Sequence, residues 1–78
     1  MSTKIYLGID KRDGEQVIAI ALDSGDYTVA ANSDGDSPEE IKAWLAEHVT
    51  PGWLYNAKNY WPLRAGSEVD SLDLIFEV

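Results

Sequence analysis

Seven carboxylates and a single cation occupy residues 23–47, and this cluster is the strongest chemical feature of the chain. The acidic residues are Asp23, Asp26, Asp34, Asp36, Glu39, Glu40 and Glu47, and the cation is Lys42. The segment therefore holds most of the excess negative charge of a chain whose net charge is −8. Such a negative field attracts basic partners and repels nucleic acid and anionic membranes. We call the seven residues the acidic block and predict that they bind a basic protein surface, without direct contact to nucleic acid or membrane.

Two of these carboxylates have a spacing that could support acid–base catalysis. Asp34 and Asp36 lie two residues apart, but they fall in a Gly/Ser loop with no apolar pocket that would separate their pKa values. His48 is the only histidine, and no serine or cysteine pattern makes it part of a catalytic triad. We therefore predict that the protein is not an enzyme; a small hydrolase that uses Asp34 or Asp36 is the enzymatic alternative.

The same loop has a faint resemblance to a calcium site. Oxygen-bearing side chains alternate over residues 32–36, but Gly35 falls at the wrong position and Ala43 stands where a bidentate glutamate is needed. The chain has no cysteine, which excludes thiolate metal sites and disulfides. The sequence thus predicts no metal and no cofactor.

A second candidate region is aromatic. Two tryptophans and two tyrosines fall within residues 53–61. We expect Trp53 and Trp61 to close the core. Tyr55 and Tyr60 could take either role, and we name them as candidate anchors for a partner because tyrosine is enriched at the centres of interfaces.

The periodicity of apolar residues predicts the elements that position these groups. Residues 5–9 and 27–31 alternate as half-buried strands, whereas residues 17–22 form a continuous apolar run typical of a strand covered on both faces. Short turns join the three, which indicates an antiparallel meander. Ser37-Pro38-Glu39-Glu40 is a capping-box helix start, and an apolar stripe continues to His48. Residues 72–78 alternate as a final strand. Residues 53–55 suggest a short strand, and residues 56–61 a turn or a single helical turn.

The fold prediction is a single compact α+β domain over residues 1–78, with an antiparallel sheet of three meander strands plus a C-terminal strand and one helix packed on it. No long apolar stretch follows a basic region, so we expect neither a signal peptide nor a membrane span. We expect a cytoplasmic monomer.

The whole chain, with its meander, its S-P-E-E helix and its final L-D-L-I-F-E-V strand, resembles small acidic phage anti-CRISPR proteins that inhibit the type I-C Cascade complex. The resemblance implies binding to a Cas subunit and a block of target DNA recognition in the cytoplasm of an infected bacterium. Partial DNA mimicry is one route. A chain of this length spans roughly 30 Å, over which duplex DNA carries about 18 charges, so full mimicry is excluded.

Two other interpretations stay open. Residues 5–48 are similar to the small domain of HicB-type antitoxins, which implies neutralisation of a basic RNase toxin. A structural or assembly protein that self-associates through the edge of its last strand is the third.

Overall fold

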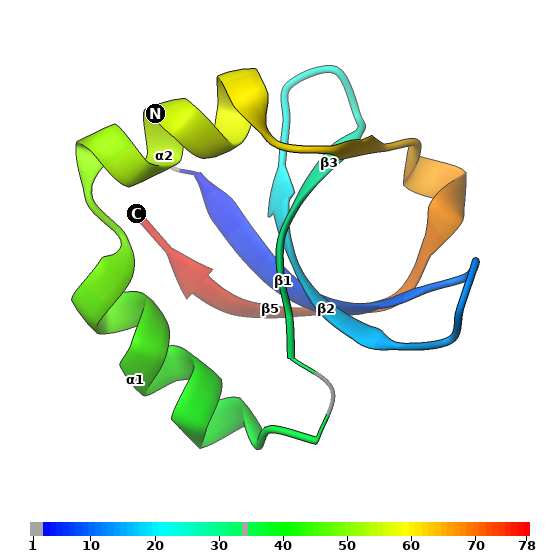
Figure 1. Ribbon diagram of the computed structural model, residues 1–78, viewed down its shortest axis with the longest axis horizontal. Coiled ribbons are helices and arrows are strands. Elements are labelled where there is room, and N and C mark those ends of the chain that lie inside the picture. Colours follow the sequence, from blue (N-terminus) through cyan, green and yellow to red (C-terminus); the bar gives the residue numbers. More distant parts are fainter. Residues whose placement is uncertain (1–2, 34) are drawn as a thin grey trace.

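The computed structural model describes residues 3–33 and 35–78, in which five strands, two α-helices and one short 3₁₀ helix follow one another along the chain (Figure 1). The elements are β1 (Lys4–Asp10), β2 (Gln16–Ala21), β3 (Tyr27–Asn32), α1 (Pro38–His48), α2 (Pro51–Tyr60), β4 (Leu63–Arg64), η1 (Gly66–Glu68) and β5 (Val69–Glu77). The α+β class is confirmed.

All strands belong to one antiparallel sheet of order β4-β3-β2-β1-β5. The first three strands form the predicted meander, in which Leu7 pairs with Ile18 and Ile20 pairs with Thr28. The C-terminal strand closes the other side of the sheet against β1. Strand β2 is central, and four consecutive residues, 17–20, are buried, as the continuous apolar run predicts.

The expectation of one helix is wrong, because residues 51–60 form a second helix instead of a short strand followed by a turn or a single helical turn. Thr50 caps it by accepting a hydrogen bond from the Trp53 backbone N–H at 3.1 Å, and Pro51 occupies the first turn. The aromatic residues suggest a strand by propensity. However, Trp53, Ala57 and Trp61 recur at helical spacing and face the sheet.

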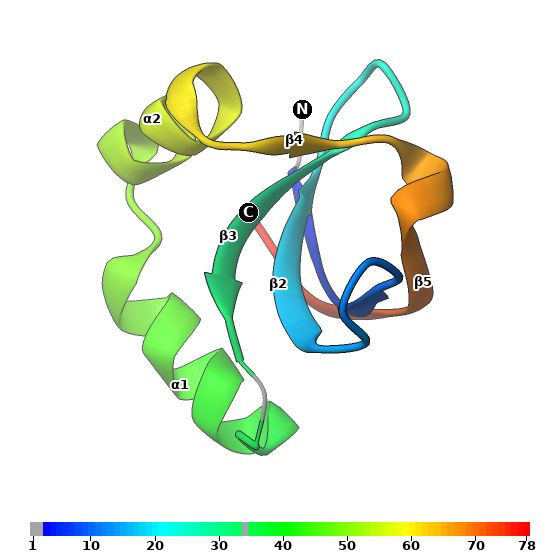
Figure 2. The ribbon, with the colours of Figure 1, turned by 45° about the vertical axis from the view of Figure 1, so that its right-hand side comes forward.

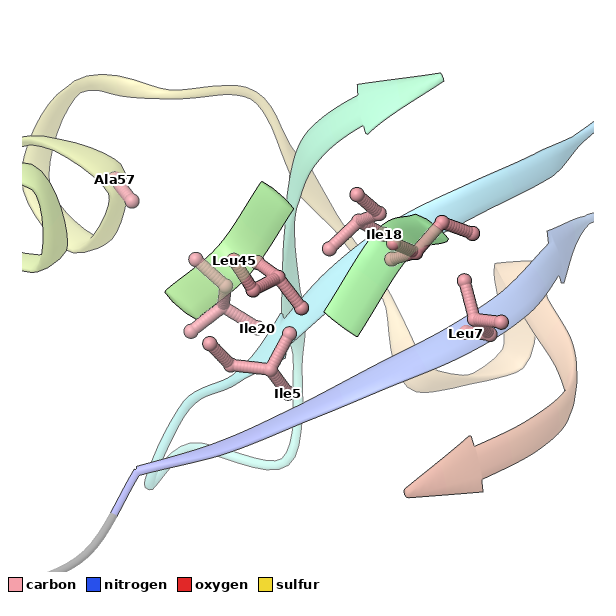
Figure 3. Close-up of a cluster of buried hydrophobic side chains, with 7 residues drawn as sticks. Ile5, Leu7, Ile18, Ile20, Leu45 and Ala57 are labelled. Carbon is pink, nitrogen blue, oxygen red and sulfur yellow. The ribbon is translucent and has the colours of Figure 1, made fainter. Parts of the chain in front are cut away.

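Both helices cover the same face of the sheet and enclose the main core with it (Figure 1). Figure 3 shows side chains from β1, β2 and the helices that converge on this core. The buried members are Ile5, Leu7, Ile18, Ile20, Ile41, Leu45 and Ala57. Trp53 and Trp61 pack against this cluster, which confirms their predicted place in the core.

The opposite face of the sheet is covered by the chain itself. From β4 at one edge, the chain passes through η1 to β5 at the other edge, and the sheet curls around this connection (Figure 2). On this side the Tyr6 and Tyr27 rings meet edge to face, with centroids 6.1 Å apart. Gly8 allows side chains of β5 to pack directly against the backbone of β1. A Cβ atom at position 8 would lie 2.7 Å from Val69 Cγ1 and 2.9 Å from Leu72 Cδ2.

Strand β5 departs from simple alternation. Its pairing with β1 shifts register twice, and Ser71 adopts the left-handed conformation at φ 54°. Because of the first shift, the neighbouring residues Ile75 and Phe76 both pack against the core, while Leu74 is half exposed. The outer edge of β5 pairs with no other strand among the described residues.

Candidate functional site: an acidic groove between α1 and β3

The connection from β3 to α1 is built by local hydrogen bonds that the sequence encodes. The Glu40 backbone N–H donates to Ser37 Oγ at 3.3 Å, and the Ser37 N–H donates to Glu40 Oε1 at 3.2 Å, so the predicted capping box is confirmed. The Asp36 N–H donates to the Ser33 carbonyl at 3.0 Å. These bonds fix the direction in which α1 leaves the sheet.

A long-range contact holds the same loop against β2. Gln16 Nε2 donates to the Ser33 carbonyl at 3.0 Å and lies 3.5 Å from the Asp36 carbonyl. Ser33 is buried as a result. The predicted site residue Asp34 lies outside the described residues.

A groove of about 330 Å³ lies between α1 and the end of β3. Its volume is at the lower end of the range for ligand sites. Ile18, Ala31, Ile41 and Trp44 supply its apolar surface, and Asp36 and Glu40 line it with carboxylates. Figure 2 shows α1 running alongside the last residues of β3. The groove therefore combines an apolar floor with negative charge.

Trp44 forms one wall of the groove and is 37% exposed. The His48 ring stacks on its indole with centroids 4.3 Å apart, and Trp53 packs against it edge to face at 6.2 Å. The His48 ring is itself positioned by a 2.8 Å contact between its Nδ1 and the Trp44 carbonyl oxygen. These contacts hold the indole in place, so binding of another molecule there would cost this side chain little conformational freedom.

The charge of the groove extends to the hairpin between β1 and β2. Asn32, which lines the groove, donates through its Nδ2 to the Glu15 carboxylate. We define the acidic rim as Glu15, Asp36 and Glu40. Over residues 3–33 and 35–78, both ion pairs of Lys or Arg with a carboxylate involve Asp10. In this part of the chain, no Lys or Arg side chain forms an ion pair with the rim.

The structure separates the described part of the acidic block into groups. Asp23 and Asp26 lie at the turn between β2 and β3, whereas Asp36, Glu39 and Glu40 lie at the opposite end of β3, where α1 begins (Figure 1). The six residues of β3 span about 20 Å between the two groups. Glu47 is in the last turn of α1, about 12 Å along the helix from Glu39. The expectation that one side of the molecule carries the whole acidic block thus does not hold for Asp23 and Asp26, at the turn between β2 and β3.

Tyr55 and Tyr60 both lie on α2 and are 59% and 72% exposed. Their rings contact each other edge to face, with centroids 6.2 Å apart. They form a small aromatic patch away from the groove, and their role as partner anchors stays a prediction.

Within residues 3–33 and 35–78, Asp10 is the only buried carboxylate, and no pattern in the sequence singles it out. Asp10 is 3% exposed and accepts hydrogen bonds from the Arg12 backbone N–H at 2.9 Å and from Arg64 Nε at 3.3 Å. The Arg12 N–H lowers the pKa of Asp10, burial opposes this, and the two guanidinium groups lower it further. Asp10 thus links strands rather than presenting charge to a partner.

Glu15 and Trp44 were also missed as parts of a site. Glu15 belongs to a sequence segment of balanced charge, and Trp44 fits the apolar stripe of α1. Only the pairing of β2 with β3 brings Glu15 beside the groove. Only the packing of α1 leaves the Trp44 side chain partly exposed.

Comparisons with protein-family models, curated proteins and solved structures found no match to this chain. In the described segments, no group of three or more His, Cys, Asp or Glu side chains is arranged to hold a metal ion. Neither helix in that part of the chain is long and apolar enough to cross a membrane.

Proposed function

We propose that the protein is a non-enzymatic inhibitor that binds a basic, nucleic-acid-binding surface of a partner protein. The observation that carries this proposal is the acidic rim beside an apolar groove. Within residues 3–33 and 35–78, its three carboxylates form no ion pair with Lys or Arg. Charges of one sign speed association with an oppositely charged surface, and adjacent apolar groups give the complex its lifetime.

The partner suggested by the resemblance is a Cas subunit of a CRISPR effector of the Cascade type. Such a subunit must hold nucleic acid, and a protein that occupies its basic surface would block recognition of target DNA. The two groups of carboxylates at the ends of β3 would meet two basic patches about 20 Å apart. Mimicry of DNA would then be partial, since the charges do not form one continuous row.

The test is capture of purified type I-C Cascade by the immobilised protein at increasing salt, together with the binding of target DNA by the captured complex. We expect capture that weakens as salt rises from 50 to 200 mM, and loss of DNA binding at one inhibitor per complex. The double variant Asp36→Lys, Glu40→Lys should weaken capture at least tenfold.

The matched control is Asp70→Lys, Asp73→Lys, which changes the net charge equally but places the lysines on β5, at the far edge of the sheet. It should retain most of the binding. Equal loss in both double variants would show that net charge alone matters. Absence of capture at 50 mM salt would overturn the Cascade proposal, and capture of a basic RNase toxin instead would favour the antitoxin alternative.

A further inference from the structure

The groove between α1 and β3 has an aromatic wall of which one face is already covered. The His48 ring stacks on the Trp44 indole with centroids 4.3 Å apart. Side chains of an α-helix lean toward its N-terminus, over the residues three and four positions earlier. The Trp44 side chain therefore extends toward Glu40 and Ile41, which line the groove together with it. The groove thus lies on the N-terminal side of the indole, and His48 lies on its C-terminal side.

Two carboxylates line the same groove. Asp36 comes from the connection after β3, and Glu40 comes from the first turn of α1. Glu40 Oε1 accepts the Ser37 backbone N–H at 3.2 Å, which holds this side chain beside the start of the helix. Within residues 3–33 and 35–78, no Lys or Arg forms an ion pair with either carboxylate. A cationic ligand would therefore not have to displace a basic side chain of this part of the chain.

The floor of the groove is apolar. Ile18 of β2, Ala31 of β3 and Ile41 of α1 supply it. The volume of about 330 Å³ is at the lower end of the range for small-ligand sites, so it suits one long side chain better than a folded segment. The matching occupant has an apolar stem and a positively charged, flat end.

We infer that the groove binds one arginine side chain of the partner, with the guanidinium stacked on Trp44 and paired with Asp36 and Glu40. The inference rests on the proposed function and names the anchor that the site selects. Arginine meets each requirement, because its planar cation stacks on aromatic rings, its N–H groups pair with carboxylates and its methylene stem covers apolar surface. Arginine is also one of the residues that contribute most to binding at protein interfaces.

Other occupants fit the groove less well. Lysine carries the same charge, but its ammonium group is a strongly hydrated point charge without a flat face to stack on the indole. An apolar side chain would fill the floor and leave both carboxylates without a partner. A second copy of this chain would bring its own net charge of −8 to an acidic surface. A basic partner with an exposed arginine therefore matches the groove best.

The first test measures binding of three capped amino acids to the full chain by NMR: N-acetyl-arginine amide, N-acetyl-lysine amide and N-acetyl-citrulline amide. Citrulline has nearly the shape of arginine but no charge. We expect the arginine probe to bind about threefold more tightly than the lysine probe and about tenfold more tightly than the citrulline probe. The Trp44 indole N–H and the amides of α1 should shift most. An arginine probe that fails to bind, or binds no more tightly than either of the others, would overturn the inference.

Variants of two neighbouring glutamates test the charge of the groove. Glu40→Gln removes the charge but retains a side-chain oxygen for the capping box, and it should weaken binding of the arginine probe about fivefold. Glu39→Gln makes the same change one residue earlier in α1, and it should alter binding by less than about twofold, because exposed charges outside the groove are screened. Equal losses in the two variants would mean that the probe responds only to the general negative field.

A second pair of variants tests the aromatic wall. Trp44→Leu keeps an apolar side chain but removes the flat ring, so it should weaken binding of the arginine probe about threefold. Tyr55→Leu removes an exposed ring from α2, away from the groove, and should leave the affinity unchanged. Unchanged affinity in Trp44→Leu would overturn the stacking of the guanidinium on the indole.

The result is separable from the proposed function. Salt-sensitive capture of Cascade that is the same for the parent and Trp44→Leu, without preference for the arginine probe, would overturn the arginine anchor and leave the proposed function standing. Selective binding of the arginine probe in the groove without capture of Cascade would retain the arginine site and reject that partner.

Discussion

Arg64 Nε lies 3.3 Å from Asp10 Oδ2, and this contact joins two residues that are 54 positions apart. Arg64 belongs to β4 at one edge of the sheet, and Asp10 ends β1, next to the opposite edge. The two groups can meet only because the sheet curls around the connection through η1 (Figure 2). The ion pair is therefore a marker of the curled fold, and its loss should be detectable as a change in stability.

Replacing Asp10 should make the stability of the protein less dependent on acid pH. The hydrogen bonds of Arg12 and Arg64 hold the pKa of Asp10 below its ordinary value in the folded state. Such a carboxylate stabilises the fold above the unfolded-state pKa of about 4, and this contribution is lost as pH falls toward the lower folded-state pKa. Asp10→Asn should therefore be less stable than the parent at pH 7, by a margin that shrinks at pH 3.

Urea unfolding at a series of pH values measures this difference. Asp73→Asn on the exposed surface of β5 is the control, and it should follow the parent protein closely. A stability difference between Asp10→Asn and the parent that is the same at pH 3 and pH 7 would contradict the assigned role of the carboxylate.

A methyl group at position 8 should disrupt the contact between β1 and β5. In Gly8→Ala the new Cβ would lie within 3.0 Å of Val69 Cγ1 and Leu72 Cδ2, and 3.3 Å from the Asp70 carbonyl oxygen. We expect a loss of about 1–3 kcal/mol in the free energy of unfolding, because the neighbouring side chains must move. Chemical denaturation provides the measurement.

Gly52→Ala serves as the matched control for this change. Gly52 lies in the first turn of α2, and a Cβ atom there would meet nothing within 4 Å. The same substitution should be neutral there or stabilise by up to about 1 kcal/mol, since alanine favours the helix. Similar losses at positions 8 and 52 would show that close packing is not the cause.

Removing the hydroxyl of Thr28 should stabilise the protein. Thr28 is fully buried near the start of β3, and its Oγ1 has no hydrogen-bond partner among the described residues. Thr28→Val replaces the hydroxyl with a methyl group of similar shape, so we expect a gain of about 1 kcal/mol in the free energy of unfolding. Thermal unfolding should show a higher midpoint.

Thr28→Ser separates the two halves of the side chain. It keeps the hydroxyl and removes the methyl group, so it should destabilise by about 1 kcal/mol through lost apolar burial. A Thr28→Val variant that is less stable than the parent would mean that the hydroxyl is hydrogen-bonded in solution.

Much of the local structure was predictable because its causes are short-range. The strand at residues 5–9, the apolar run of β2 and the capping box of Ser37 and Glu40 each depend on neighbours within a few residues, and these three elements are confirmed. The half-buried alternation predicted for residues 5–9 is not, because β1 buries Gly8 and Asp10 as well as Ile5 and Leu7. The second helix was missed because its aromatic residues favour strands by propensity, while the decisive contacts of Ala57 with the sheet are distant in sequence.

The sequence by itself determined the amount of charge, its concentration in residues 23–47 and the elements that carry it. Tertiary structure alone decided which charges lie together: strand β3 holds Asp23 and Asp26 about 20 Å from Asp36 and Glu40, and strand pairing brings Glu15 beside the groove. It also left Trp44 half-open and buried Asp10 between two arginines. The physical reason is that charge is a property of each residue, whereas neighbourhood and burial depend on contacts between segments that the chain brings together only when it folds.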